Sequence, residues 1–290
     1  MVLSKIATYL EMIKFQHSIF ALPFAYLGAF LAEKRVPSLA ALFWITVAMV
    51  GARSFAMAVN RIIDKEIDRR NPRTANRALP KGQLSVSGVL VFSLASLVVF
   101  LIAVFHLAPL CRYLWPFVVI PFVIYPYTKR FTWLSHFLLG ACLGLAPVGA
   151  WVAITNTLAV EPLLLGAAVM CWVAGFDIFY AIQDVDFDRA HGLRSIPAAF
   201  GIRISLVFTK TLHFFVIVLL AWVGLRLDLG FIYFTGVFIA GVLLIYENSI
   251  VKADDVSRLN VAFFTMNGVI SVVMFLFVAG EILFRGANSV

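Results

Sequence analysis

The sequence has few charged residues and few cysteines, and each shortage argues against a class of protein. Only 13% of the 290 residues are charged, while 62% are hydrophobic and the mean hydropathy is +0.98. A soluble domain has roughly 25% charged and about 45–50% apolar residues, so a disordered chain and an ordinary soluble enzyme are excluded. The three cysteines form no CxxC pair, which indicates neither a disulfide framework nor a metal cluster. The composition predicts a polytopic membrane protein.

Long apolar segments are what the sequence has in abundance. A hydrocarbon core about 30 Å thick needs roughly 20 apolar residues of helix. No segment shows the two-residue alternation of a membrane barrel, so we expect an all-α fold. The nine expected transmembrane helices are Phe15–Ala32, Leu39–Val59, Val86–Phe105, Leu114–Tyr125 with a short extension at each end, Leu134–Thr155, Pro162–Ile182, Ile204–Leu225, Gly230–Tyr246 and Val261–Phe284. The fourth contains two prolines and is expected to be kinked.

Basic residues are divided unevenly between the two sides of these helices. Eighteen of the 23 Lys and Arg residues lie in the N-terminal segment and around the connections after helices two, four, six and eight, and five lie on the other side. Cytoplasmic loops of membrane proteins carry the excess of positive charge. We therefore expect the N-terminus in the cytoplasm and the C-terminus outside, and we interpret the net charge of +8 as an orientation signal rather than a sign of nucleic-acid binding.

Acidic residues gather in two short segments on the predicted cytoplasmic side. The first reads NxxxDxxxD and contains Asn60, Asp64 and Asp68, here named the first aspartate row. Residues four apart lie on one face of a helix. The first aspartate row is therefore expected to align its oxygen atoms where the second helix leaves the membrane.

The second acidic segment reads YxxxDxxxD and lies 120 residues after the first. It contains Tyr180, Asp184 and Asp188, here named the second aspartate row. The offset covers four predicted helices, and an even number of helices returns the chain to the same side. We expect one membrane domain of two four-helix halves in parallel repeat, about residues 1–130 and 131–250, followed by a final helix at about 261–284.

Two aspartate rows that face one cavity predict a binding site for Mg²⁺, which prefers hard oxygen ligands. Seven basic residues accompany three acidic ones between Asn60 and Lys81. A diphosphate binds both Mg²⁺ and Arg or Lys side chains, and beside an apolar cavity it would belong to a lipid. Metal and cations would stabilise the departing diphosphate and leave an allylic carbocation. The alternative is that these residues are ordinary solvated loop charges without a ligand. Two copies of the motif at matching helix ends argue against this alternative.

Arg53 lies one heptad before Asn60 and inside the second expected helix. An ionisable residue at that depth is costly and normally faces a cavity or a partner. One interpretation is a clamp for the carboxylate of a small aromatic acceptor; the other is a snorkelling residue or a partner of an aspartate. The basic and aromatic turn that contains Lys129 could reach a phosphate or anchor its helix at the interface, and Arg194 could act like it from the second half.

Three segments resemble the UbiA superfamily of intramembrane aromatic prenyltransferases. They are NRIIDKEIDRRNPRTANRALPKG (60–82), YPYTKRFT (125–132) and FDIFYAIQDVDFDRAHGLRSIP (176–197). The resemblance covers nearly the whole chain and is nearest to the 4-hydroxybenzoate polyprenyltransferase branch of bacterial quinone biosynthesis. It implies Mg²⁺-dependent transfer of a polyprenyl group from its diphosphate to a ring carbon of an aromatic acid, at the bacterial cytoplasmic membrane.

The resemblance also implies roles for individual residues. Arg53 falls at the position of an acceptor-binding arginine, and Lys129 and Arg194 fall where contacts with the diphosphate are expected. Asp177 matches a family carboxylate of less defined role, one heptad before Asp184. The residues that match the two motifs of the family are Asn60, Asp64, Asp68, Asp184 and Asp188, with the four aspartates as metal ligands and Tyr180 among the substrate-binding residues.

Several alternatives stay open at the level of the sequence. The Lys14–Ser18 stretch is less typical of ubiquinone enzymes and leaves room for a relative that prenylates a naphthoate-type acid in the futalosine route to menaquinone. A secondary transporter also has internal repeats, but its ligands usually lie near the bilayer midplane. The proton acceptor is unassigned, with Asp177 or the released diphosphate as candidates. The histidines show no metal-ligand spacing, and no role is predicted for His136 or His191.

Overall fold

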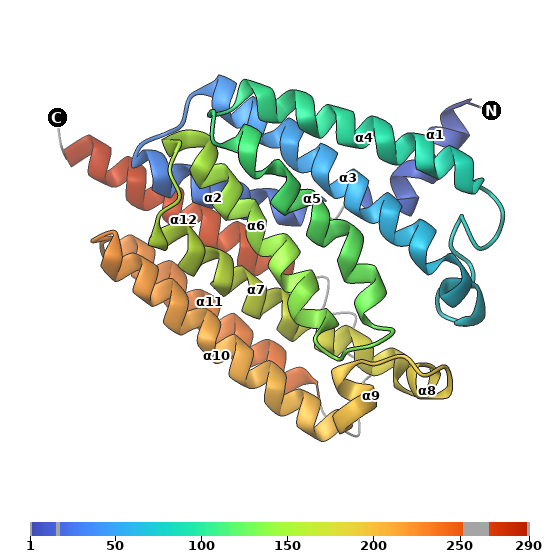
Figure 1. Ribbon diagram of the computed structural model, residues 1–290. Coiled ribbons are helices and arrows are strands. Elements are labelled where there is room, and N and C mark those ends of the chain that lie inside the picture. Colours follow the sequence, from blue (N-terminus) through green and yellow to red (C-terminus); the bar gives the residue numbers. More distant parts are fainter. Residues whose placement is uncertain (1, 16–17, 252–266, 289–290) are drawn as a thin grey trace.

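The computed structural model describes residues 2–15, 18–251 and 267–288, and within these ranges the regular secondary structure is entirely helical (Figure 1). This confirms the all-α prediction. The helices are α1 (Val2–Met12), α2 (Ser18–Glu33), α3 (Leu39–Arg70), α4 (Val86–His106), α5 (Cys111–Thr128), α6 (Ser135–Thr155), α7 (Val160–Ala181), η2 (Ile182–Asp184), α8 (Val185–Ala190), α9 (Ile196–Phe200), α10 (Ile202–Arg226), α11 (Phe231–Ile250) and α12 (Asn267–Asn288). The beginning of the ninth expected segment, residues 261–266, lies outside the described residues.

Within the described residues, seven helices are long and apolar enough to cross a membrane, which confirms a multi-pass membrane protein. They are α3, α4, α6, the continuous stretch from α7 through α8, α10, α11 and α12. Helix α2 is apolar but shorter, and α5 contains Pro116, Pro121 and Pro126. Large apolar side chains such as Phe117, Phe231 and Phe238 lie exposed on the outside of the bundle, where a lipid environment would cover them.

Helix α3 continues well beyond its apolar segment, and this extension carries the first aspartate row. The helix begins where the Ser38 side chain accepts a hydrogen bond from the Ala41 amide at 3.2 Å, because a serine at the N-cap satisfies an otherwise unpaired N–H. It ends with Arg69 and Arg70 in its last turn, where positive charge is favoured by the helix dipole.

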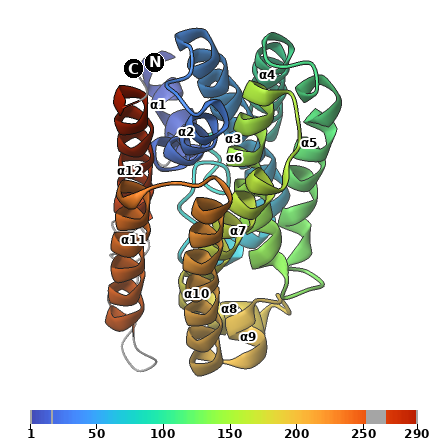
Figure 2. The ribbon, with the colours of Figure 1, turned by 90° about the vertical axis from the view of Figure 1, so that its left-hand side faces the viewer.

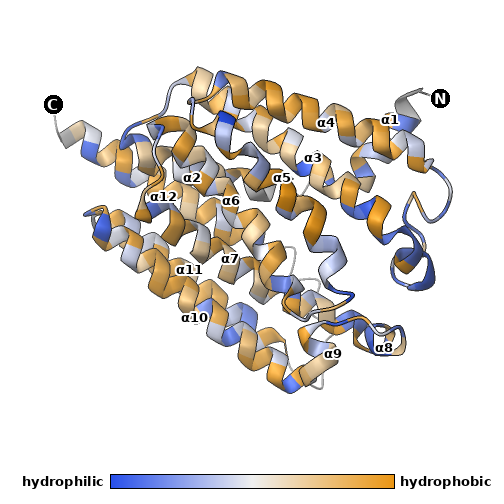
Figure 3. Cartoon of the chain, viewed as in Figure 1, coloured by the Kyte–Doolittle hydropathy of each residue, from blue (hydrophilic) through white to orange (hydrophobic). Residues whose placement is uncertain are grey.

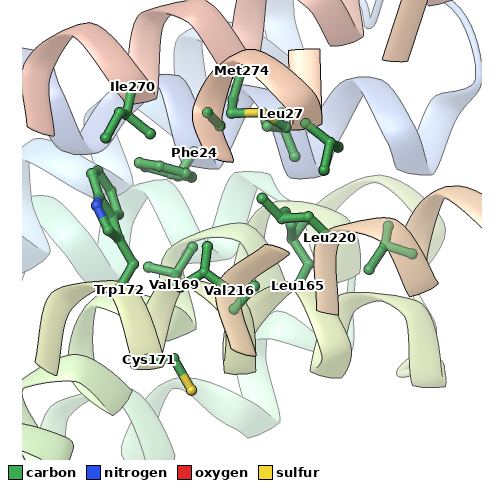
Figure 4. Close-up of a cluster of buried hydrophobic side chains, with 14 of the residues drawn as sticks. Phe24, Leu27, Leu165, Val169, Cys171, Trp172, Val216, Leu220, Ile270 and Met274 are labelled. Atoms are coloured by element: carbon green, nitrogen blue, oxygen red, sulfur yellow. The ribbon is translucent and has the colours of Figure 1, made fainter. Parts of the chain in front are cut away.

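The main hydrophobic core joins helices that are distant in sequence. Figure 4 shows Phe24 and Leu27 of α2 beside Ile270 and Met274 of α12, above side chains of α7 and α10. Helices α6 and α7 approach closely through small residues: a Cβ on Gly144 would lie 2.4 Å from the Gly166 carbonyl oxygen. Close backbone approach is how membrane helices gain packing energy.

Figure 3 shows hydrophilic residues gathered at one end of the bundle, and the two ribbon views place α8 and α9 at that end, beside the start of α10 (Figures 1 and 2). The connection between α3 and α4, the short helices α8 and α9, and the last turn of α5 lie at this end. The fold thereby brings both acidic segments to the same side of an apolar bundle.

Candidate active site

A cavity of about 230 Å³ opens at the polar end of the bundle. Its walls come from α3, the connection after α3, the end of α5, the start of α6 and the segment from α7 to Ser195. Eight of the ten residues predicted for the site line it: Asn60, Asp64, Asp68, Lys129, Asp177, Tyr180, Asp184 and Asp188. The two aspartate rows thus face one cavity, although they are far apart in the sequence.

The first aspartate row lies on one unbroken helix and is neutralised by cations. Asp64 and Asp68 are each only 4% exposed. The Asp64 Oδ2 atom accepts hydrogen bonds from Lys129 Nζ at 2.6 Å and from Asn60 Nδ2 at 3.0 Å. Arg77 Nη1 lies 2.8 Å from both carboxylate oxygens of Asp68. These charge-assisted contacts fix the direction in which both carboxylates point.

The second aspartate row does not lie on a regular helix. Helix α7 ends at Ala181, the 3₁₀ turn η2 contains Asp184, and α8 contains Asp188. Short 3₁₀ segments inside a helical run often mark functional hinges. The row therefore crosses a change of backbone geometry, which the four-residue spacing shared with the first aspartate row does not reveal.

Arg73 joins the segment after α3 to the second aspartate row. It follows α3, yet it donates hydrogen bonds to both oxygens of Asp184 and to the Tyr180 hydroxyl, and its guanidinium lies over the Tyr180 ring. Asn71 Nδ2 donates to Asp184 Oδ1 at 2.9 Å. Burial acts to lower the pKa of Arg73, but the hydrogen bond with Asp184 and the nearby Tyr180 outweigh it and raise that pKa above its ordinary value.

Two further carboxylates on the wall have partners other than Lys or Arg. Ser195 Oγ donates to Asp188 Oδ2 at 2.8 Å. Asp177 Oδ2 lies 2.7 Å from Nδ1 of His136, a buried side chain in the first turn of α6. Sequence reasoning missed His136 because it has no metal-ligand spacing. Its one signal is that it closely follows the YPYTKRFT segment, which ends at Thr132.

Arg53 and Arg194 lie outside the lining of the cavity. The Nε atom of Arg53 is buried and has no hydrogen-bond partner within the described residues. Arg194 donates from Nη1 to the Phe131 carbonyl at 3.0 Å, and its backbone amide donates to the Lys129 carbonyl at 2.7 Å. Arg194 therefore holds the turn that presents Lys129, and direct contact with a phosphate stays a prediction.

The chemistry of the donor set suits a hard divalent cation. In the part of the chain that the structure describes, no three His, Cys, Asp or Glu side chains form a group that could hold a metal ion; the carboxylates of the two rows pair instead with Lys129, Arg77, Arg73 and Ser195. The ligand atoms on offer are oxygens only, which Mg²⁺ prefers. The buried Asp64 Oδ1 has no hydrogen-bond partner among the described residues, and the charge nearest to it is that of Arg130, whose Nη2 lies 3.8 Å away.

Several known proteins are similar to this chain in sequence and in fold. The UbiA prenyltransferase family matches residues 21–277. A 4-hydroxybenzoate octaprenyltransferase from Marinobacter nauticus is 32% identical over 78% of this chain and 77% of its own length. The apo structure of a UbiA homolog from Aeropyrum pernix K1 is 32% identical, covers 91% of this chain and 97% of that chain, and has a TM-score of 0.82. A UbiA homolog from Archaeoglobus fulgidus, bound to DMAPP and Mg²⁺, shares the fold at 20% identity with a TM-score of 0.70, over 95% and 99% of the two chains.

Proposed function

The chain belongs to the UbiA prenyltransferase family, and from this membership we propose that it transfers a polyprenyl group from polyprenyl diphosphate to a ring carbon of a 4-hydroxybenzoate-type acid in quinone biosynthesis. The observation that carries the proposal is a cavity at the polar end of an apolar bundle, walled by two aspartate rows and their cations. The printed activity of the Marinobacter nauticus relative and the DMAPP and Mg²⁺ bound to the Archaeoglobus fulgidus homolog support it.

The aspartates of the two rows are the proposed Mg²⁺ ligands: Asp64, Asp68, Asp184 and Asp188. When bound, Mg²⁺ neutralises the diphosphate and stabilises it as a leaving group. Lys129, Arg73 and Arg77 already donate to carboxylates on the cavity wall, so their cations lie beside the proposed position of the diphosphate. We assign Asn60 and Tyr180 to orienting Asp64 and Arg73, with which they share hydrogen bonds.

The proposed reaction breaks one bond and forms another at the prenyl C1 atom. The C1–O bond breaks and its electron pair leaves with the diphosphate. The ring carbon ortho to the phenolic hydroxyl then forms the new C–C bond, and loss of its proton restores the aromatic ring. Positive charge from Lys129 and Arg73 favours the first step, because it acts where negative charge develops in a site of low dielectric.

Arg53 is the proposed clamp for the carboxylate of the acceptor. Its buried Nε–H has no hydrogen-bond partner within the described residues, although leaving a buried donor unpaired costs about 1–3 kcal/mol. A carboxylate that accepted from the guanidinium would remove that cost. With Arg53 as the clamp, the proposed site has a diphosphate region at the aspartate rows and an acceptor region deeper along α3.

We also propose the finer topology. Helices α2 and α5 would cross the membrane with the seven others, which gives nine spans arranged as two four-helix halves in parallel repeat plus α12. The meeting of both aspartate rows in one cavity supports the repeat. The surplus of basic residues at that end supports a cytoplasmic site and N-terminus in the bacterial inner membrane.

An assay with purified protein tests the proposal and names the acceptor. The protein is given a labelled polyprenyl diphosphate, Mg²⁺, and either 4-hydroxybenzoate or a naphthoate-type acid, and products are identified by mass. We expect a C-prenylated 4-hydroxybenzoate that EDTA abolishes. A prenylated naphthoate alone would move the enzyme to menaquinone synthesis, and the absence of product from both acids would overturn the proposal. A transporter would yield no product and would move substrate across vesicles.

A further inference from the structure

His136 has a defined proton position because of its two hydrogen bonds. The residue is 3% exposed and lines the cavity. Its Nε2 atom accepts from the backbone N–H of Ile196 at 3.2 Å, and its Nδ1 atom lies 2.7 Å from Asp177 Oδ2. A backbone amide can only donate, so Nε2 carries the lone pair and Nδ1 carries the proton. His136 is therefore a neutral imidazole that donates to Asp177.

Asp177 differs in its partners from three of the four aspartates of the two rows. Asp64, Asp68 and Asp184 each form an ion pair with Lys or Arg, whereas Asp177 receives one hydrogen bond from an uncharged ring. Its second oxygen, Oδ1, has no hydrogen bond to the described residues, and the side chain is 24% exposed. A carboxylate that is neither neutralised by a Lys or Arg nor assigned to the metal keeps a lone pair that can accept a proton from a substrate.

We propose that Asp177 is the catalytic residue that takes the proton from the alkylated ring carbon, and that His136 is the positioning residue that orients Asp177. This inference rests on the proposed function. The ring C–H bond breaks, its electron pair restores the aromatic ring, and the proton forms an O–H bond on Asp177. The proton leaves later to the released diphosphate or to solvent. His136 does not relay it, because Nε2 faces a backbone N–H. Donation from Nδ1 keeps the Asp177 carboxylate oriented.

Two substitutions at position 136 distinguish a role in positioning Asp177 from a purely structural role of the hydrogen bond with Ile196. In His136→Asn the amide nitrogen takes a place near that of Nδ1 and can donate to Asp177, while the acceptor for Ile196 is lost. In His136→Ala both contacts are lost. We expect His136→Ala to lower kcat about tenfold or more and Asp177→Asn to lower it about 10²–10⁴-fold, the range of general base catalysis. His136→Asn should keep most of the activity. His106→Ala, on the opposite side of the membrane, is the control.

A ring-deuterated acceptor gives a readout that a purely structural role would not move. We expect the isotope effect on kcat to be larger in His136→Ala than in the parent protein, because proton transfer becomes slower relative to the other steps. Acceptor affinity, measured with EDTA present, should be the same in both proteins. Equal losses in His136→Asn and His136→Ala, an unchanged isotope effect, or weakened acceptor binding would each overturn the inference. A parent protein that forms no prenylated acid would overturn the proposed function instead.

Discussion

The first and second aspartate rows share one sequence spacing, yet the backbone presents them in different ways. The first lies on the continuous helix α3, where Asp64 and Asp68 are almost fully buried and held by Lys129 and Arg77. The second crosses from α7 through the 3₁₀ turn η2 into α8. A spacing shared in sequence therefore does not require a shared local structure, because tertiary contacts decide how each helix ends.

The two rows also depend on each other unequally. Asp184 of the second row is bound by Asn71 and Arg73, which both follow the helix of the first row. Asp64, by contrast, is bound by Lys129 from the turn after α5, in the same half of the chain. The first row takes its cations from its own half of the chain, whereas Asp184 takes its partners from the other half. This asymmetry suggests that the first row is the fixed side of the site and that Arg73 sets the position of the second.

The largest expected effect comes from removing a carboxylate of the fixed side. Asp64→Asn removes one proposed metal ligand and leaves Lys129 without its charged partner, so we expect Mg²⁺-dependent transfer to fall by about 10²–10³-fold, the scale of losing one preorganised group that stabilises developing charge. Glu66→Gln is the matched control, because Glu66 is an exposed partner of Arg69 on the same helix. Steady-state rates over a range of Mg²⁺ concentrations measure the effect. Unchanged activity in Asp64→Asn would remove the first row from the mechanism.

Arg73→Ala tests whether one side chain couples the two rows. It removes the hydrogen bonds to Asp184 and Tyr180 together, and we expect about a 10²-fold loss of kcat/KM for the polyprenyl diphosphate. Arg73→Lys should recover little, because an ammonium cannot reproduce the two-pronged geometry of a guanidinium. If Arg77→Ala and Arg73→Ala caused equal losses that added in the double variant, the proposed coupling through Arg73 would be wrong.

Arg53→Ala should affect the acceptor and spare the diphosphate. The charged hydrogen bonds in question are worth about 1.5–3 kcal/mol, so we expect the KM for the carboxylated acceptor to rise by about 10- to 100-fold. The KM for polyprenyl diphosphate should stay unchanged. A phenol that lacks the carboxylate is the control substrate, since the parent protein and Arg53→Ala should use it equally poorly. A selective rise in the KM for polyprenyl diphosphate would contradict the proposed role of Arg53 as a clamp for the acceptor.

Sequence reasoning predicted the all-α membrane fold because apolar segment length and composition are local signals. It also placed both aspartate rows at one end, and eight of its ten predicted site residues line the cavity. It did not single out Arg73, Arg77 or His136, whose partners lie up to 111 residues away. Nor did it predict the 3₁₀ turn at Asp184, because a four-residue spacing suits an unbroken helix equally well.

Ser195→Ala tests how firmly the second row is held, and it has the smallest expected effect. Ser195 donates to Asp188 at 2.8 Å and also accepts from the Ala198 amide at the start of α9, so its hydroxyl orients a proposed metal ligand of the second row. Loss of a single hydrogen bond of about 0.5–1.5 kcal/mol predicts a roughly 2- to 10-fold lower rate. Higher Mg²⁺ should restore part of it, because the carboxylate itself remains. Ser195→Thr keeps the hydroxyl and is expected to retain the parent rate.

A loss as large as that of Asp64→Asn would mean that the second row is as fixed as the first, and the contrast between the two rows would fail.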